Sequence, residues 1–194
     1  IKVFCPEVNE MYEKGLNYNQ YNFNGIDSKL EGKYRKGHFN GVATIVSKLF
    51  ELFKPNQAFF GEKDFQQTQI VKRLIDLEKH KTKLIICSTV REKNGLAMSS
   101  RNNLLSQKNR ENSSIIFHNL NYVKTHFKTT DFDQIISKCI KSINSYDGFK
   151  TEYFEIVDSF SLSKQKKYCE NKSYRVFVSV IVDEVRLIDN ILLN

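Results

Sequence analysis

The sequence is poor in residues that interrupt regular structure, and it has no long apolar run. Its 194 residues include 8 Gly, 2 Pro and no Trp, which excludes a collagen-like chain or a Pro- and Gly-rich disordered chain. No segment approaches the ~18 consecutive apolar residues that cross a bilayer. The first residues, Ile1 to Pro6, lack the charged start and cleavage site of a signal peptide. We therefore expect a soluble, cytoplasmic protein with no membrane partner.

Cysteine is also scarce, and the few cysteines form no recognisable site. Cys5, Cys87, Cys139 and Cys169 lie far apart and make no Cys-x-x-Cys pair. This spacing signals neither a zinc knuckle nor a redox dithiol, and it predicts buried, reduced thiols. Lys and Arg number 30 against 22 Asp and Glu, a net charge of +8, which favours anionic partners. The basic residues are scattered without a stacking motif, so we expect no nucleic-acid partner.

The first half of the chain alternates helical and strand patterns. Apolar residues at helical spacing predict an amphipathic helix over residues 37–54, ended by Pro55. The apolar run at 57–60 predicts a buried strand, a second helical pattern follows, and residues 83–88 predict another strand. Helix, strand, helix and strand with short links indicate an α/β fold, a parallel sheet with flanking helices.

The second half has a different organisation. After a polar loop at 89–104, residues 107–127 and 132–143 have helical patterns. Three strand patterns follow at residues 151–157, 174–182 and 185–193, and Asp183 with Glu184 predicts a tight hairpin between the last two. Helices followed by neighbouring antiparallel strands indicate a small α+β domain. We therefore expect one domain over residues 1–104 and a second over residues 105–194.

The first loop whose residues could form a ligand site follows the strand at 57–60. Gly61 permits close backbone approach, the following helix offers free N–H groups, and Lys63 adds a positive charge. That combination describes a phosphate site. The alternative is a plain strand-to-helix turn in which Asp64 caps the helix and Lys63 is solvated.

Two more loops carry groups that bind anions. Ser99, Ser100 and Arg101 combine hydroxyls with a guanidinium that could grip phosphate oxygens, although a polar loop between domains would have the same composition. Arg35 and His38 precede the helix at 37–54 and could meet a carboxylate. For His38 alone, capping or packing at the helix start is the common role.

Taken together, the three loops resemble one family in order and spacing. The runs Gly-His-Phe-Asn-Gly-Val-Ala-Thr from Gly37, Phe-Phe-Gly-Glu-Lys-Asp-Phe-Gln-Gln from Phe59 and Gly-Leu-Ala-Met-Ser-Ser-Arg-Asn from Gly95 resemble pantothenate synthetases, also called pantoate:beta-alanine ligases. The resemblance is strong over residues 1–104 and weaker over 105–194. It implies a partial Rossmann-like nucleotide-binding domain followed by a lid-like α+β domain.

The resemblance also implies a reaction and a set of site residues. The family joins D-pantoate to beta-alanine with ATP, through a pantoyl-adenylate, usually with Mg²⁺ and commonly as a homodimer. By resemblance, the residues that contact ATP are Gly61, Glu62, Lys63, Asp64, Val90 (through its backbone), Met98, Ser99, Ser100 and Arg101. Lys63, Ser99 and Arg101 would have catalytic roles, and Gln67 would bind pantoate. The residues that would bind a metal stay unknown.

Two departures from the family pattern affect these expectations. Lys36 stands where the family usually has Pro, which loosens the turn without removing Arg35 or His38. The family's first signature, Met-Gly-Ala-Leu-His-x-Gly-His, does not occur in residues 1–194. We therefore expect the chain to correspond to the C-terminal two thirds of such an enzyme and to be inactive alone. The alternatives are a related nucleotidyltransferase with another acceptor and a non-catalytic or dimer-forming module derived from this fold.

Overall fold

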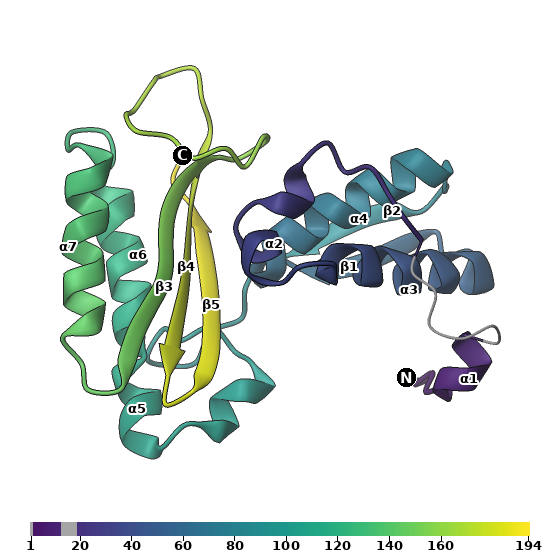
Figure 1. Ribbon diagram of the computed structural model, residues 1–194, viewed down its shortest axis with the longest axis horizontal. Helices are drawn as coiled ribbons and strands as arrows, with labels where there is room; N and C mark the ends of the chain where they lie inside the picture. Colours follow the sequence, from purple (N-terminus) through teal and green to yellow (C-terminus); the bar gives the residue numbers. More distant parts are fainter. Residues whose placement is uncertain (1, 13–18) are drawn as a thin grey trace. The chain divides into compact units, whose positions relative to one another are not determined.

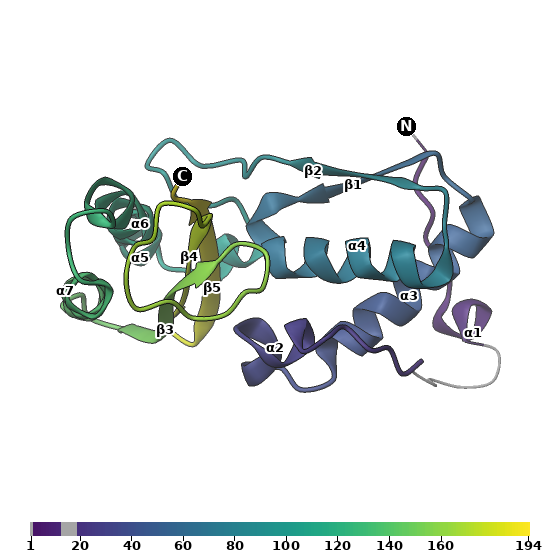
Figure 2. The same cartoon turned by 90° about the horizontal axis from the view of Figure 1, so that it is seen from above.

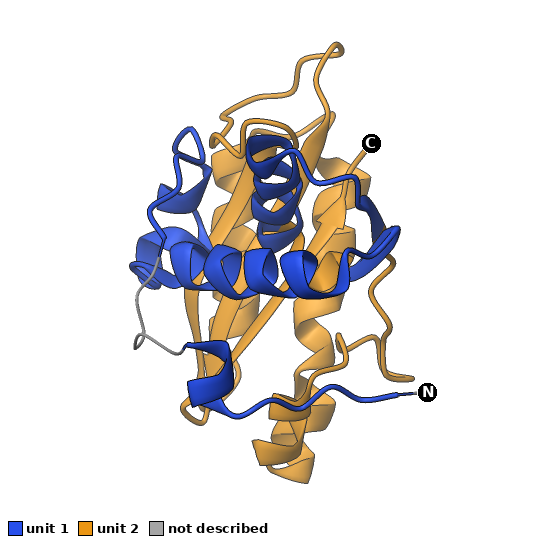
Figure 3. Cartoon of the chain, turned by 90° about the vertical axis from the view of Figure 1, so that its right-hand side faces the viewer, with its two compact units in different colours: residues 1–60, 66–85 blue, residues 61–65, 86–194 orange. Residues whose placement is uncertain are grey.

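The computed structural model describes residues 2–12 and 19–194, and the chain divides into two compact units (Figure 3). The first unit comprises residues 1–60 and 66–85, and the second comprises 61–65 and 86–194. In chain order the elements are α1 (Val8–Met11), η1 (Ile26–Ser28), α2 (Glu31–Tyr34), α3 (His38–Phe53), β1 (Gln57–Gly61), η2 (Glu62–Asp64), α4 (Phe65–Glu78), β2 (Lys83–Cys87), η3 (Ser100–Leu104), α5 (Gln107–Asn112), α6 (Ser114–His126), α7 (Phe132–Asn144), β3 (Phe149–Asp158), β4 (Tyr174–Val182) and β5 (Val185–Leu192). The two-domain division at residue 104 stays a prediction.

The first unit contains the amphipathic helix that the sequence predicts. Helix α3 begins after Gly37, whose φ of +76° lies in the left-handed region that glycine adopts at little cost. The apolar residues of α3 and α4 form one cluster with Phe23; its buried members are Phe23, Phe39, Ala43, Val46, Phe50, Ile70, Val71 and Leu74. Helix α4 connects the paired parallel strands β1 and β2 and runs along them (Figure 2). The predicted α/β arrangement with flanking helices is therefore confirmed.

Strand β1 is not the buried strand that its apolar sequence suggested. Its residues alternate between exposed and half-buried, and Phe59 keeps 64% of its surface exposed. Ala58 and Phe60, on the other face, pack against the cluster of the first unit. In the described residues β1 pairs only with β2. An apolar run predicts a strand, but the burial of that strand depends on which other elements cover its two faces, and the run does not specify them.

The second unit is organised on an antiparallel sheet with the order β3-β4-β5 (Figure 1). Val182 pairs with Val185, and the register continues to Arg175 opposite Leu192. Between these strands, Asp183 and Glu184 have φ values of +46° and +70°, as a two-residue type I′ turn requires. The predicted hairpin and the α+β class of this region are therefore confirmed.

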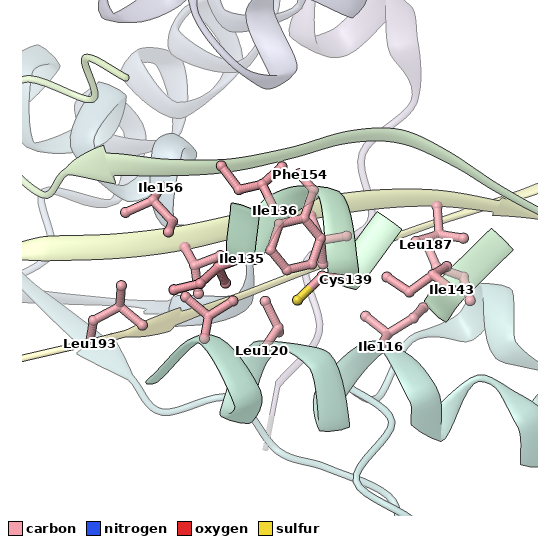
Figure 4. Packing of buried hydrophobic residues seen from close by; sticks show 14 of the residues in the cluster. Ile116, Leu120, Ile135, Ile136, Cys139, Ile143, Phe154, Ile156, Leu187 and Leu193 are labelled. Carbon is pink, nitrogen blue, oxygen red and sulfur yellow. The ribbon is translucent and has the colours of Figure 1, made fainter. Parts of the chain in front are cut away.

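Helices α6 and α7 cover one face of this sheet (Figure 1). Alternate residues of β4, from Tyr174 to Val182, belong to the same buried cluster as apolar residues of both helices. Cys139 of α7 lies inside the cluster (Figure 4), and burial raises the pKa of its thiol to about 12. The expectation of buried cysteines holds for Cys139 alone and is wrong for the other three, which are exposed, because cysteine composition carries no information about position in a fold.

The helical pattern at 107–127 forms two helices rather than one. Helix α5 ends and α6 begins at Ser113, whose hydroxyl donates to the Asn109 carbonyl at 2.6 Å. Such a bond to the preceding turn competes with the backbone and bends helices. No helix in the described ranges is long and apolar enough to span a membrane.

Glu78, at the end of α4, ties together three segments of the first unit. Its carboxylate accepts hydrogen bonds from the Ser47 hydroxyl on α3 at 2.8 and 2.9 Å and from the Tyr21 hydroxyl at 2.8 Å. His80 Nε2 lies 2.7 Å from Glu78 Oε2. Burial raises the pKa of Glu78, but the hydrogen bonds from Ser47, His80 and Tyr21 outweigh burial and lower that pKa from its ordinary 4.5.

Replacing Glu78 with Gln should lower the free energy of unfolding at neutral pH by about 1–2 kcal/mol, because a charged acceptor of several hydrogen bonds is lost. A lowered pKa in the folded chain stabilises it above pH 4.5, and this stabilisation is lost as the pH falls below that value. Urea unfolding at neutral pH and near pH 3.5 should therefore show a smaller difference between wild type and variant at the lower pH. Glu51→Gln, at an exposed carboxyl of α3, is the control. A difference independent of pH would contradict this role for Glu78.

Candidate functional site

Three of the predicted site residues meet in the second unit. Lys63, Ser99 and Arg101 line one narrow pocket, although Lys63 is separated from the other two by more than thirty residues of sequence. The pocket is completed by Leu96, Ala97, Asn102, Ile116, Arg186, Leu187, Ile188 and Asp189. The volume of its cavity is only about 10 Å³. A larger ligand that reaches these groups would therefore require the surrounding loops to open.

The loop before Ser99 is held by Arg91. The Arg91 guanidinium donates to both carboxylate oxygens of Asp189 on β5, at 2.6 and 3.0 Å, and to the Gly95 carbonyl at 3.1 Å. It also lies 3.9 Å from the centre of the Phe117 ring on α6. A Cβ on Gly95 would lie 2.6 Å from that ring, and the φ of Gly95 is +93°. Both close approach and backbone conformation therefore require glycine at position 95.

A second ion pair holds the same loop to α5. Arg110 donates from Nε and Nη2 to the Glu92 carboxylate at 3.0 and 2.9 Å. Asn102 Nδ2 donates to Glu92 Oε1 at 2.7 Å and to the Ala97 carbonyl at 3.1 Å. The hydrogen bonds from Arg110, and to a lesser extent from Asn102, lower the pKa of Glu92 against the opposing effect of burial. These contacts fix the turn that precedes Ser99.

The Gly61–Phe65 segment is held by the β4–β5 hairpin. Arg175 donates to Glu62 Oε1 at 2.8 Å and to Asn190 Oδ1, and its guanidinium lies 3.9 Å from the centre of the Phe65 ring. Asn190 Nδ2 donates to the carbonyls of Glu62 and Lys63, at 3.1 and 2.8 Å. The peptide groups on both sides of the Lys63 Cα are thereby attached to β5.

The charges around the pocket are arranged unevenly. Asp189 is 4% exposed, and burial raises the pKa of its carboxyl while the Arg91 guanidinium opposes that rise. Glu62, Glu92 and Asp189 each pair with an arginine of their own. Within the described part of the chain, neither Lys63 nor Arg101 has a carboxylate within ion-pair distance. The pocket lining therefore combines Lys63, Arg101 and the Ser99 hydroxyl with two paired side chains, Arg186 with Glu152 and Asp189 with Arg91. Asp189 also interacts electrostatically with Lys63. The excess of cationic groups suits an anionic ligand.

The other predicted site residues lie in the same loops without lining the pocket. The carboxylate of Glu62 is directed to Arg175, and the Val90 carbonyl accepts from the Met98 N–H at 2.9 Å. Met98 itself is 53% exposed. Outside the pocket lining are also Gly61, Asp64 and Ser100. Whether these residues contact a nucleotide stays a prediction.

The predicted pantoate ligand, Gln67, lies half-buried in the first turn of α4, in the first unit. Its neighbour Gln66 is buried, and Gln66 Nε2 donates to the carbonyls of Ile26 and Lys29 at 2.8 and 2.7 Å. Gln66 Oε1 accepts from the Glu31 N–H at 3.0 Å. Gln66 therefore stabilises the segment before α3, and the role of Gln67 stays a prediction.

The residues present do not form a metal site. Across residues 2–12 and 19–194, no group of three or more His, Cys, Asp or Glu side chains is placed to hold a metal ion. The expected Mg²⁺ therefore stays a prediction, without an assigned ligand. We assign it no protein ligand and no part in the steps proposed for this chain.

Sequence reasoning assigned no role to Arg175, Asp189 or Asn190, which hold the loops of the site. Arg175 is more than a hundred residues from Glu62 in sequence, so no local pattern joins them. One signal was available: Asp189 and Asn190 are adjacent polar residues between the apolar pairs Leu187-Ile188 and Ile191-Leu192, and both are buried. Buried polar residues usually have specific hydrogen-bond partners.

Comparisons with known proteins give one consistent family. A family model described as "Pantoate-beta-alanine ligase" matches residues 2–192. The pantothenate synthetase of Flavobacterium psychrophilum is 41% identical over 194 residues, covering 100% of this chain and 69% of that protein. The pantothenate synthetase of Christiangramia forsetii is 42% identical with the same coverage.

Solved structures agree in fold with these sequence relatives. Pantothenate synthetase from Thermus thermophilus superposes with a TM-score of 0.87 at 32% identity, covering 97% of this chain and 68% of that one. Pantoate-beta-alanine ligase from Francisella tularensis, described as complexed with beta-gamma ATP and beta-alanine, has a TM-score of 0.71 at 31% identity. It covers 95% of this chain and 62% of that chain.

Replacing Arg91 with Met should lower the free energy of unfolding at neutral pH by about 3–5 kcal/mol, because the buried Asp189 carboxylate loses its partner. Without Arg91 the pKa of Asp189 should rise further. A carboxyl with a raised pKa in the folded state destabilises it at high pH, and the loss is relieved as the pH falls and the carboxyl is protonated. Chemical unfolding at several pH values measures this, with Lys108→Met at an exposed position of α5 as control. An equal loss of stability at all pH values would contradict the burial of an unpaired charge.

Proposed function

This chain belongs to the pantoate-beta-alanine ligase family, a family of ligases, and on that premise we propose that it binds ATP at the pocket of Lys63, Ser99 and Arg101. There it contributes to the joining of D-pantoate to beta-alanine through a pantoyl-adenylate. The chain covers about two thirds of the length of its curated relatives. The proposal therefore concerns the part of the reaction that these residues can perform.

The reaction needs two steps because a free carboxylate is a poor acyl donor. In the first, a pantoate carboxylate oxygen attacks the α-phosphorus of ATP, and the bond to the bridging oxygen breaks to release pyrophosphate. In the second, the beta-alanine amine attacks the carbonyl carbon of the adenylate, AMP leaves, and the amine loses a proton. Negative charge develops on phosphate oxygens in the first step, so fixed cationic donors accelerate it.

The observation that carries the proposal is the charge arrangement around the pocket. Lys63 and Arg101 come from separate segments and line the same space, while Asp189 and Glu62 are paired with Arg91 and Arg175. An anionic ligand can therefore interact with both cations without displacing an existing ion pair. A polyphosphate matches these charges once the surrounding loops open, because Arg offers forked donors and Lys a compact charge.

Each residue has a distinct proposed role. Lys63 and Arg101 bind phosphate oxygens and stabilise the charge that develops on the leaving pyrophosphate. Ser99, whose hydroxyl caps η3 by accepting from the Arg101 N–H at 3.2 Å, donates to the same phosphates. Gln67 binds pantoate by resemblance to the family. The α+β region after residue 104 acts as a lid over the site.

The ligands of a related structure support this choice of substrates. The Francisella tularensis ligase is described with beta-gamma ATP and beta-alanine. We also propose, from the family resemblance, that the protein acts in the cytoplasm and as a homodimer. Because the first family signature with its histidine does not occur in residues 1–194, we propose that this chain alone binds the nucleotide without completing the reaction.

Pantoate-dependent exchange of labelled pyrophosphate into ATP tests the adenylation step. The 194-residue chain should show little exchange, and a chain lengthened at its N-terminus with the corresponding segment of the Flavobacterium psychrophilum relative should show exchange that requires pantoate. Exchange that needs another acid instead of pantoate would indicate a related nucleotidyltransferase. No exchange in either, together with no ATP binding, would support a non-catalytic module and contradict the proposal.

Replacing Lys63 with Ala should reduce the rate of exchange in the lengthened chain on the order of 10²-fold. This is the effect that removal of one preorganised donor to the charge of a transition state typically has in enzymes. In the 194-residue chain the same change should weaken binding of a fluorescent ATP analogue. Lys93→Ala, which removes an equal charge from an exposed position of the second unit, is the control. Equal rates for wild type and Lys63→Ala would remove Lys63 from its assigned role.

A further inference from the structure

We propose that Arg175 and Asn190, on the β4–β5 hairpin, are positioning residues that set the backbone conformation at Lys63 and thereby its affinity for an anionic ligand. The effect on the ligand rests on the function proposed above, whereas the effect on the backbone does not. Neither side chain lines the pocket. Both would act through the Gly61–Phe65 segment, with which they share one compact unit.

Asn190 provides the direct contact. Its single amide nitrogen donates to two consecutive carbonyls, those of Glu62 and Lys63, at 3.1 and 2.8 Å. These bonds hold the two peptide groups that meet at the Lys63 Cα, and so they restrict the φ and ψ of Lys63. Asn190 is 2% exposed, so water does not readily replace these bonds. The direction in which the Lys63 side chain leaves the backbone therefore depends on Asn190.

Arg175 holds Asn190 and Glu62 in place at the same time. It is 3% exposed, and burial lowers the pKa of its guanidinium while the Glu62 carboxylate opposes that change. One nitrogen donates to Asn190 Oδ1 and another to Glu62 Oε1, and the plane lies over Phe65. The bond to Asn190 Oδ1 orients its amide so that the nitrogen faces the two carbonyls. A lysine offers no planar fork and would not make both contacts in this geometry.

The hairpin thus serves the site without touching the ligand. A charged side chain stabilises a developing charge best when its position is fixed beforehand, and displacements of about 1 Å are costly. Lys63 follows a strand end and precedes α4, where backbone groups have few regular hydrogen bonds. Attachment to β5 supplies the missing constraint.

Trypsin provides a direct test, because it cleaves after Lys63, at the carbonyl that accepts from Asn190. Asn190→Leu keeps the size and charge of the chain and removes the donor. We expect the rate of cleavage at the Lys63–Asp64 bond, monitored by mass spectrometry, to increase about tenfold. We also expect the Kd of a fluorescent ATP analogue to rise about tenfold. Each change corresponds to the net free energy of roughly one hydrogen bond. Arg175→Lys should shift both in the same direction. Asn194→Leu, which removes comparable bonds to Lys172 and Tyr174, should change neither.

Each outcome decides the proposal. Unchanged cleavage at Lys63 in both variants overturns it, and so does faster cleavage with an unchanged Kd, because the residues would then be structural only. If the wild-type chain binds no ATP, the proposed function fails, and the cleavage rates alone decide whether the hairpin positions Lys63. If circular dichroism shows that Asn190→Leu does not fold, Arg175→Lys and its cleavage rate carry the test.

Discussion

The buried guanidinium of Arg175 is the interaction on which the candidate site depends. A full positive charge with 3% exposure is costly unless it is paired and hydrogen bonded. Arg175 satisfies this requirement with Glu62, Asn190 and the face of Phe65. Because these partners lie on the loop after β1, at the start of α4 and on β5, meeting the requirement also fixes the loop that carries Lys63.

Three arginine–carboxylate ion pairs of this kind lie around the pocket. Arg91 with Asp189, Arg110 with Glu92, and Arg175 with Glu62 each join a loop of the site to a helix or strand of the second unit. Each pair removes a carboxylate from competition for the remaining cations. These acids thereby hold the loops of the pocket in place, and Lys63 and Arg101 have no carboxylate within ion-pair distance among the described residues. Structural stability and site electrostatics therefore have a common origin.

Much of the fold could be predicted because its longest elements have strong local patterns. Helices α3 and α7 and strand β4 combine regular apolar spacing with clear ends, and the turn at Asp183 and Glu184 is specified by its neighbours. The errors fall where regular spacing does not decide the outcome. The burial of β1 depends on what covers its second face, and the break at Ser113 depends on one side-chain hydrogen bond.

By itself, the sequence determined the order of elements and the class of each half, because spacing and residue type act over a few neighbours. The anion-binding chemistry of its loops stays a prediction. The tertiary structure decided which side chains of those loops converge. It brought Lys63, Ser99 and Arg101 to one pocket and paired Glu62 with Arg175 across more than a hundred residues. Such pairings arise when a sheet and its helices pack and leave a buried charge in need of a partner. The spacing of residues along the sequence does not indicate which distant residue will pair with a buried charge, so only the folded chain reveals the pair.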